Sequence, residues 1–254
     1  MTAGFEVSFL PIMATLLLLW LFRPSQKVHF DIPPSAFWLI WMVFLALIIA
    51  LVYAKRRGIG KRREELNRFA MESGLTYSET APEGLGTALS GMNLVGFSIN
   101  PRFSNVMTGN RSGCDLVIAD RKVGGGKNQS TTTIVAVKSA EPIPSFMLCS
   151  ENMLWNIADR VGYKDIDFEG APEFSKRFFL HGDNVQAVRD FFTPEVIRAF
   201  EQLDSAAGLY ASGTGNWLVL YKPGRVLAVQ QIRDLLQKAE TVADAFRSKT
   251  RFGR

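Results

Sequence analysis

A run of nineteen uncharged residues, AFWLIWMVFLALIIALVYA, occupies positions 36–54 and limits the possible folds of this chain more than any other feature. As a helix rising about 1.5 Å per residue, the run is about 28 Å long, close to the roughly 30 Å hydrocarbon core of a bilayer. It therefore predicts a helix that spans a membrane.

Six basic residues follow this run within nine positions. They are Lys55, Arg56, Arg57, Lys61, Arg62 and Arg63. Lysine and arginine clusters at the end of a span resist translocation and favour the anionic lipid head groups of the inner leaflet. We therefore expect this end of the span, and the chain after it, to lie on the cytoplasmic side.

A second apolar run, VSFLPIMATLLLLWLF, covers residues 7–22, and a short connector with two prolines joins it to the first. The N-terminal residues 1–6 contain no lysine or arginine, unlike a secretory signal peptide. We therefore predict an antiparallel transmembrane hairpin within residues 1–54, with both termini cytoplasmic. Trp20, Trp38 and Trp41 would form an aromatic belt at its outer interface.

The sequence pI of about 9.3 raises the question of nucleic-acid binding. However, residues 64–246 contain 17 Lys and Arg against 22 Asp and Glu, a net charge of −5. The excess positive charge lies in residues 55–63 and in the tail, residues 247–254. A nucleic-acid binder needs its cations on the folded face that meets the phosphates, so this distribution favours lipid as partner and disfavours nucleic acid.

The remaining chain predicts one α+β domain over residues 75–246, mainly of antiparallel strands and ending in a long helix. Residues 55–74 would form a basic hinge, with a break at residues 58–60, and a connecting helix over 61–73. The last helix is indicated by apolar residues at helical spacing between Ile232 and Phe246. Predicted strands cover residues 92–100, 114–123, 131–138 and 146–149, and a hairpin joins 209–212 to 217–222.

Gly124-Gly125-Gly126-Lys127 invites a phosphate-loop interpretation. The Walker pattern requires an earlier glycine where Arg121 stands, and Ser or Thr after the lysine where Asn128 stands. The following residues are strand-like, whereas a phosphate loop leads into a helix. We therefore predict the tip of a β-hairpin.

Asp165, Asp167 and Glu169 imitate the start of a calcium-binding loop, but the twelfth position is Lys176 and lacks the required acid. The acids alternate with Ile166 and Phe168, as on a half-buried strand. The strand interpretation is favoured, and the three acids remain the metal-site candidates.

Other reactive side chains have no partner that the sequence can identify. His181 has no nucleophile beside it, and Cys114 and Cys149 are too few for a zinc site, so both cysteines are expected to be buried. Six phenylalanines between residues 174 and 200 predict core, with one or two left exposed as a docking patch. No catalytic residue or cofactor is predicted.

The membrane run, the basic hinge, the GGGK hairpin and the motifs DIDFE, PEFSKRFFL and FFTPEV together resemble an uncharacterised family of bacterial membrane-anchored proteins with a cytoplasmic domain of unknown function. The resemblance covers roughly residues 55–246 and implies a bacterial inner-membrane location. It provides no catalytic residue.

Two functions are compatible with these features. The first is a non-enzymatic accessory or scaffolding subunit of a membrane complex, binding a protein partner or a second copy of itself. The alternative is a membrane-tethered ligand-sensing or enzymatic domain that uses the acidic segment Asp165–Glu173.

Overall fold

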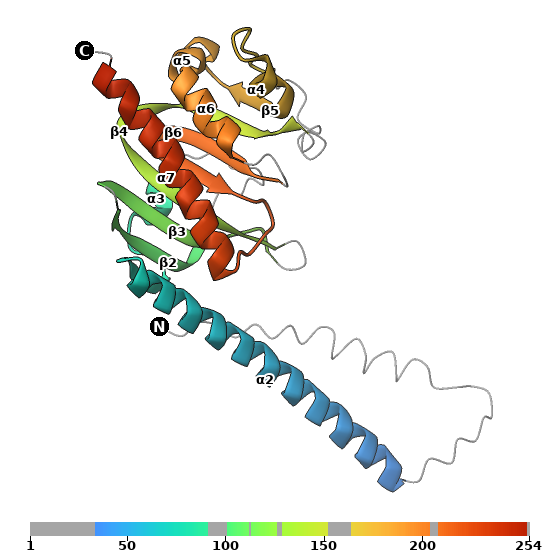
Figure 1. Ribbon diagram of the computed structural model, residues 1–254. Helices are drawn as coiled ribbons and strands as arrows, with labels where there is room; N and C mark the ends of the chain where they lie inside the picture. The colour runs from blue at the N-terminus through green and yellow to red at the C-terminus, as the bar shows by residue number, and fades with distance from the viewer. Residues whose placement is uncertain are drawn as a thin grey trace, which may run out of the picture. The chain divides into compact units, whose positions relative to one another are not determined.

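In the computed structural model, the described residues are 34–90, 101–111, 113–125, 129–151, 164–203 and 208–252. Contacts between Cα atoms divide the chain into two compact units, residues 1–57 and 58–254. The elements, shown in Figure 1, are α2 (Pro34–Glu72), β1 (Thr76–Thr80), α3 (Leu85–Ser90), β2 (Arg102–Arg111), β3 (Cys114–Val123), β4 (Ser130–Ser150), α4 (Pro172–Arg177), β5 (Phe178–Gly182), α5 (Val185–Phe191), α6 (Pro194–Gln202), β6 (Tyr210–Tyr221) and α7 (Val229–Phe252).

The second unit is built on a six-stranded antiparallel sheet with the order β1-β2-β3-β4-β5, in which β6 also pairs with β4. Strand β4 has 21 residues and is the centre of the sheet. Its first part pairs with β3, its last part pairs with β5, and β6 follows it along both parts. The predicted α+β class with antiparallel strands is confirmed, and so is the long C-terminal helix, α7.

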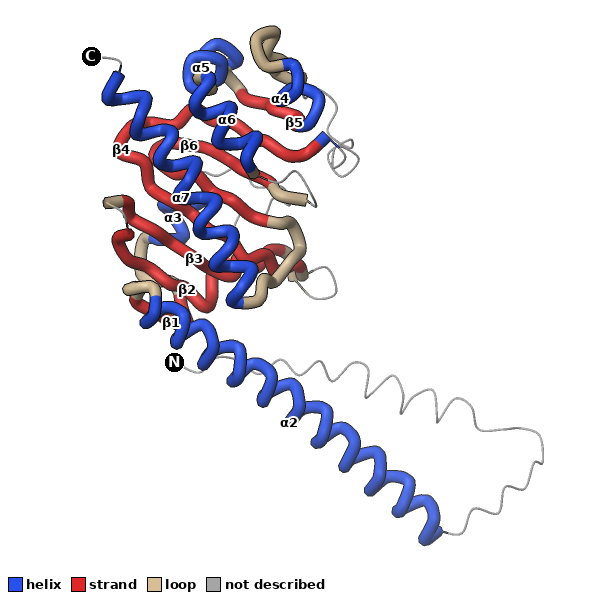
Figure 2. Tube along the Cα trace, in the orientation of Figure 1, coloured by secondary structure: helices blue, strands red, loops and turns tan. Residues whose placement is uncertain are grey.

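Buried apolar side chains cover both faces of this sheet. On the first face, α7 lies across the strands, with α5 and α6 at the β5 end (Figure 2). The last turns of α2 add Leu66 and Phe69 to this core, both 1% exposed. On the second face, α3 contributes Leu85 and Leu89 to a separate cluster. Burial on both faces explains why β3 and β4 are apolar without strict alternation.

Helix α2 continues through residues 58–60, so the predicted break there is wrong; isolated glycines weaken a helix without ending it. Ten large apolar side chains between Leu39 and Tyr53 are 48–68% exposed. No helix within the described ranges combines the length and the apolar character of a membrane span. Residues 1–33, with Trp20, and the side chain of Trp38 lie outside the described part.

Strand β4 passes through Pro142 and Pro144, where the sequence predicts an interruption between two strands. Its pairing with β6 shifts register between Lys138 and Ile143 and again before Phe146. Such an irregularity accommodates prolines, because residues in a bulge leave the regular ladder of hydrogen bonds.

The predicted hairpin over residues 209–222 is likewise wrong, since β6 is one continuous strand. Its glycines allow close packing against β4 and do not form a turn. Gly213 pairs with Phe146, and Gly215, with φ +57°, pairs with Ile143 at the irregular register. Glycine adopts this left-handed conformation without steric cost.

Other local predictions have mixed outcomes. The predicted strand over 114–123 coincides with β3. It pairs antiparallel with β4, with Val123 opposite Ser130, so the chain between them connects two strands of a hairpin, as predicted. Helix α5 is capped by Asn184, whose side chain accepts the Ala187 N–H. The predicted strand over 92–100 lies outside the described residues.

All six phenylalanines of the predicted aromatic cluster are at most 8% exposed, so none forms an exposed patch. They are Phe174, Phe178, Phe179, Phe191, Phe192 and Phe200. Consecutive phenylalanines can both be buried because Phe178 and Phe179 point to opposite faces of a sheet covered on both sides.

Candidate functional site

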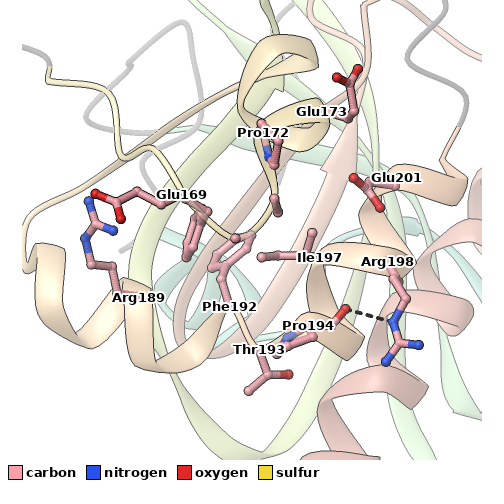
Figure 3. A pocket seen from close by; sticks show the side chains of 13 residues that line it. Glu169, Pro172, Glu173, Arg189, Phe192, Thr193, Pro194, Ile197, Arg198 and Glu201 are labelled. Atoms are coloured by element: carbon pink, nitrogen blue, oxygen red, sulfur yellow. Dashed lines mark hydrogen bonds between the residues drawn. The ribbon is translucent and has the colours of Figure 1, made fainter.

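An open cleft of about 910 Å³ lies between the segment leading into α4 and the ends of α5 and α6. Figure 3 shows its walls from close by. It is lined by Phe168, Glu169, Gly170, Ala171, Pro172, Glu173, Arg189, Phe192, Thr193, Pro194, Ile197, Arg198 and Glu201.

Short, well-defined turns position these walls. The Ala171 N–H donates to the Phe168 carbonyl at 3.0 Å, and the Phe168 N–H donates to Ser175 Oγ at 2.9 Å. Pro172 then starts α4, and Pro194 starts α6, where the missing N–H of proline costs no hydrogen bond. Thr193 occupies the N-cap position of α6 without making a side-chain capping bond.

The floor of the cleft is apolar and rigid. Phe192 stacks on Phe200, with ring centroids 5.5 Å apart, and meets Phe146 edge-on at 5.0 Å. Ile197 and the half-buried Phe168 extend this surface. Aromatic side chains locked by such contacts provide a preformed surface for binding apolar groups.

The rim carries charges of both signs. In Figure 3, Glu169 and Arg189 lie on one side and Arg198 and Glu201 on the other. The Arg189 guanidinium lies 5.6 Å from the centre of the Phe168 ring, and Arg198 pairs with Glu195 at 3.0 Å. No histidine, cysteine or lysine is among the lining residues. The cleft therefore combines an apolar floor with a rim of glutamates and arginines.

The predicted acidic segment is split by the fold. Glu169 and Glu173 line the cleft, whereas the Asp165 carboxylate accepts the N–H groups of Leu180 at 2.9 Å and Ile166 at 2.8 Å. The segment thus runs alongside β5, but it is not a strand as predicted. The predicted alternation of burial is present, since Ile166 is 2% exposed between exposed Asp165 and Asp167. Within the described residues, no three His, Cys, Asp or Glu side chains form a group able to hold a metal.

Sequence reasoning missed Glu151 as a neighbour of these acids. Burial raises the pKa of Glu151, and the negative charges of Asp165 and Asp167 raise it further. Burial also raises the pKa of Asp165, while its two backbone hydrogen bonds act in the opposite direction.

The remaining candidates do not form a reactive centre. Both cysteines are buried and free, as predicted. Burial, followed by the charges of Glu151 and Asp165, raises the pKa of Cys149 to about 12, so its thiol stays protonated at neutral pH. The Nδ1 atom of His181 lies 3.0 Å from the Lys164 carbonyl oxygen, and His181 does not line the cleft.

Two arginines of the basic hinge make ion pairs inside the second unit. Arg62 Nη2 lies 3.1 Å from both carboxylate oxygens of Asp120, which is 4% exposed. Asp120 also accepts hydrogen bonds from Asn105 at 2.8 Å and from Thr133 at 2.6 Å. Arg62 Nη1 donates to the Leu227 carbonyl at 2.8 Å. This network joins α2, β2, β3, β4 and the start of the α7 segment.

Arg63 pairs with Glu79 on β1 at 2.9 Å, and both side chains are about half exposed. Arg62 and Arg63 thus hold α2 against the sheet, a role that the sequence did not reveal. The sequence contained one signal of this role: Asp120 is a charged residue that follows the apolar run Leu116–Ala119 within a single strand.

No protein-family model matches this chain, and no curated protein matches it. Among solved structures, it is similar in fold to the crystal structure of the mycobacterial trehalose monomycolate transport factor A, TtfA. The TM-score is 0.54 and the sequence identity is 15%, over 75% of this chain and 96% of that chain. At this identity the comparison shows a shared fold.

Proposed function

We propose that this chain is a membrane-anchored, non-enzymatic accessory subunit whose second unit, residues 58–254, binds a segment of a partner protein in the cleft. The observation that carries the proposal is the cleft itself, which combines an apolar aromatic floor with a rim of mixed charge. Protein interfaces commonly have this composition, with an apolar centre surrounded by polar residues. The mycobacterial protein of similar fold is named as a transport factor, which is compatible with an accessory role.

The exposed apolar surface of α2 supports the anchor. Val43, Phe44 and Leu45 are consecutive and 49–68% exposed, so this part of the helix is apolar all round, with no polar face. A helix of this kind is stable when buried in a protein or in lipid. With Arg62 and Arg63 paired inside the second unit, the exposed cations that we assign to anionic lipid are Lys55, Arg56, Arg57 and Lys61.

The anchor predicts that the full chain stays in the membrane pellet after alkaline carbonate washing of bacterial vesicles. It also predicts that protease added outside intact cells leaves residues 58–254 undigested. Release by carbonate, or digestion from outside, would contradict an inner-membrane anchor with a cytoplasmic second unit.

The cleft predicts that Ala171→Arg, which adds a long charged side chain at the half-buried wall, lowers partner binding at least tenfold. The test uses the full chain purified in mild detergent, with the stoichiometric partner identified by cross-linking from the cleft rim. Ala140→Arg is the matched control, because residue 140 is exposed on β4. Equal loss of the partner in both variants would show that the cleft is not the binding surface.

The alternative, a membrane-tethered ligand-sensing domain, is favoured by the volume of the cleft. A cavity of about 910 Å³ is in the range of small-molecule sites. Glu169 and Glu173, from the predicted acidic segment, stand at its edge. A thermal-shift screen with metals, nucleotides and lipids distinguishes the two functions, because a ligand at a hundred times its Kd adds about 2.7 kcal/mol of stability.

A further inference from the structure

The turn between β6 and α7, residues 222–226, combines two cations with an exposed apolar side chain. Arg225 is exposed, Lys222 is half-buried, and Val226 is 47% exposed. Neither cation forms an ion pair with a residue that the structure describes. The turn therefore offers positive charge and apolar surface side by side.

Hydrogen bonds fix the backbone of this turn against the start of β4. The Gly224 N–H donates to Thr132 Oγ1 at 2.9 Å, and the Thr133 N–H donates to the Arg225 carbonyl at 2.9 Å. Because the backbone is already ordered, little conformational entropy is lost when Arg225 and Val226 bind another surface.

The same turn is held beside the part of α2 that belongs to the second unit. Arg62 Nη1 donates to the carbonyl of Leu227, the residue after Val226, at 2.8 Å. Ile59 precedes Arg62 by three positions, so the two side chains are neighbours on one side of the helix. Ile59 is 48% exposed. Two of the four exposed large apolar side chains in the described part of the second unit, Ile59 and Val226, thus lie on the same side of it.

The chain keeps this side close to the apolar run over residues 36–54. Ile59 comes five positions after Ala54, and α2 is continuous across them. Five residues of helix rise about 7–8 Å. A bilayer has roughly 5–8 Å of polar head groups on each side of its hydrocarbon core. If residues 36–54 span the membrane, Ile59 and the turn beside it lie at the level of the head groups.

The acids near this surface leave its positive charge largely intact. Asp120 is occupied by Arg62, which also holds the turn. Glu65 is the acid on the same side of α2 as Arg62, and it lies one turn farther from the apolar run. We name Ile59, Lys222, Arg225 and Val226 the turn patch.

We propose that the turn patch contacts the anionic head groups of the membrane, as a second lipid contact besides the basic hinge. This inference rests on the membrane anchor of the proposed function. Lys222 and Arg225 bind lipid phosphates, and the apolar side chains of Val226 and Ile59 enter the boundary between head groups and acyl chains. Two contacts that are far apart in the sequence fix the orientation of the second unit on the bilayer.

This orientation also bears on the cleft. The turn follows Tyr221, which pairs with Ile134 on β4, whereas Gly182 of β5 pairs with Phe146. The twelve positions between Ile134 and Phe146 span roughly 40 Å of strand. The cleft, at the β5 end, is then directed away from lipid and accessible to a protein partner.

The test places a fluorescent label on Val226→Cys in the full chain, reconstituted into nanodiscs. The nanodiscs contain equal parts of phosphatidylcholine and phosphatidylglycerol, with added phosphatidylcholine that carries a nitroxide quencher on its head group. Val185→Cys, at a valine that is 45% exposed beyond β5, is the matched control. The native Cys114 and Cys149 are buried, and the labelled wild type serves as the blank.

We expect the nitroxide to quench the label at residue 226 at least threefold more than the label at residue 185. A label at Lys61→Cys, seven positions after Ala54, is the reference for a site near lipid. If Val226→Cys lowers the melting temperature, Ala228→Cys, which is also exposed, carries the label instead.

Charge removal tests the contact with anionic lipid. Lys222→Gln/Arg225→Gln should lower the quenching at residue 226 at least twofold, as should nanodiscs of phosphatidylcholine alone. Lys164→Gln/Lys176→Gln removes two exposed cations near β5 and should leave the quenching unchanged.

The outcomes separate this proposal from the anchor. Equal quenching at residues 226 and 185, with strong quenching at residue 61, overturns the turn patch and leaves the anchor intact. A label at residue 226 that is shielded from aqueous iodide yet not quenched by the nitroxide lipid indicates a protein contact and also overturns it, as does unchanged quenching after charge removal. Failure of the chain to enter nanodiscs, or no quenching at any position, overturns the anchor as well.

Discussion

Asp120→Ala is expected to lower the free energy of unfolding by about 3–5 kcal/mol, the range for removing one partner of a buried ion pair. The variant removes an acceptor that is 4% exposed and leaves three donors without it: the Arg62 guanidinium, the Asn105 amide and the Thr133 hydroxyl. Urea unfolding of the full chain in mild detergent, followed by circular dichroism, measures the loss.

Asp115→Ala is the matched control for this experiment. Asp115 lies on the same strand, its side chain is 58% exposed, and it pairs with Lys138 at 3.6 Å. Surface ion pairs contribute roughly 0–1 kcal/mol, so the control variant should lose little free energy of unfolding.

The double variant Arg62→Met/Asp120→Ala should lose less free energy of unfolding than the sum of the two single losses, because each single change removes the same contact. Additive losses would show that the two side chains do not interact.

The Asp120 network also bears on function. It fixes the part of α2 from residue 58 onward against the sheet, and Arg62 belongs to the basic hinge. A variant that loses Arg62 therefore loses a structural contact as well as a hinge cation. Charge-removal experiments on lipid binding should change Lys55, Arg56, Arg57 and Lys61, whose cations are exposed, and leave Arg62 and Arg63 intact.

Gly213→Ala is expected to lower the free energy of unfolding by about 3 kcal/mol, at the upper end of the usual cost of overpacking. A Cβ atom at this position would lie 2.3 Å from Phe146 Cε1 and 2.5 Å from Ile143 Cγ2. Phe146 and Ile143 are 2% and 3% exposed, and Phe146 also contacts the ring of Phe192 in the cleft floor.

A melting experiment on the full chain should show a decrease of roughly 6–12 °C for this variant, by the usual scaling of melting temperature for a domain of this size. Gly86→Ala is the control, because a Cβ at residue 86 in α3 meets no atom within 4 Å. That change should be neutral or slightly stabilising, since alanine favours helix over glycine. A wild-type melting temperature for Gly213→Ala would mean that β6 is not packed against β4 as described.

The two sites differ in how far the sequence could reveal them. The cleft combines residues 168–173 with residues 189–201, and the sequence singled out Glu169 without its surroundings. Its aromatic floor was visible as a phenylalanine cluster, yet the sequence could not show that Phe192 would line a cleft. The Asp120 network combines residues 62, 105, 120, 133 and 227, which no local motif connects.

The sequence by itself determined the elements that depend on local patterns. Helical spacing from Ile232 to Phe246 predicted α7, the apolar run over 114–123 predicted β3, and glycines between two strands predicted their hairpin. Only the tertiary structure decided what depends on contacts between distant residues. It made β4 continuous through Pro142 and Pro144, and it paired Arg62 with Asp120, 58 positions away. The physical reason is that the spacing of apolar residues along the chain specifies which side of a helix or strand is apolar. Which other helix or strand packs against that side depends on contacts between distant residues and on strand register.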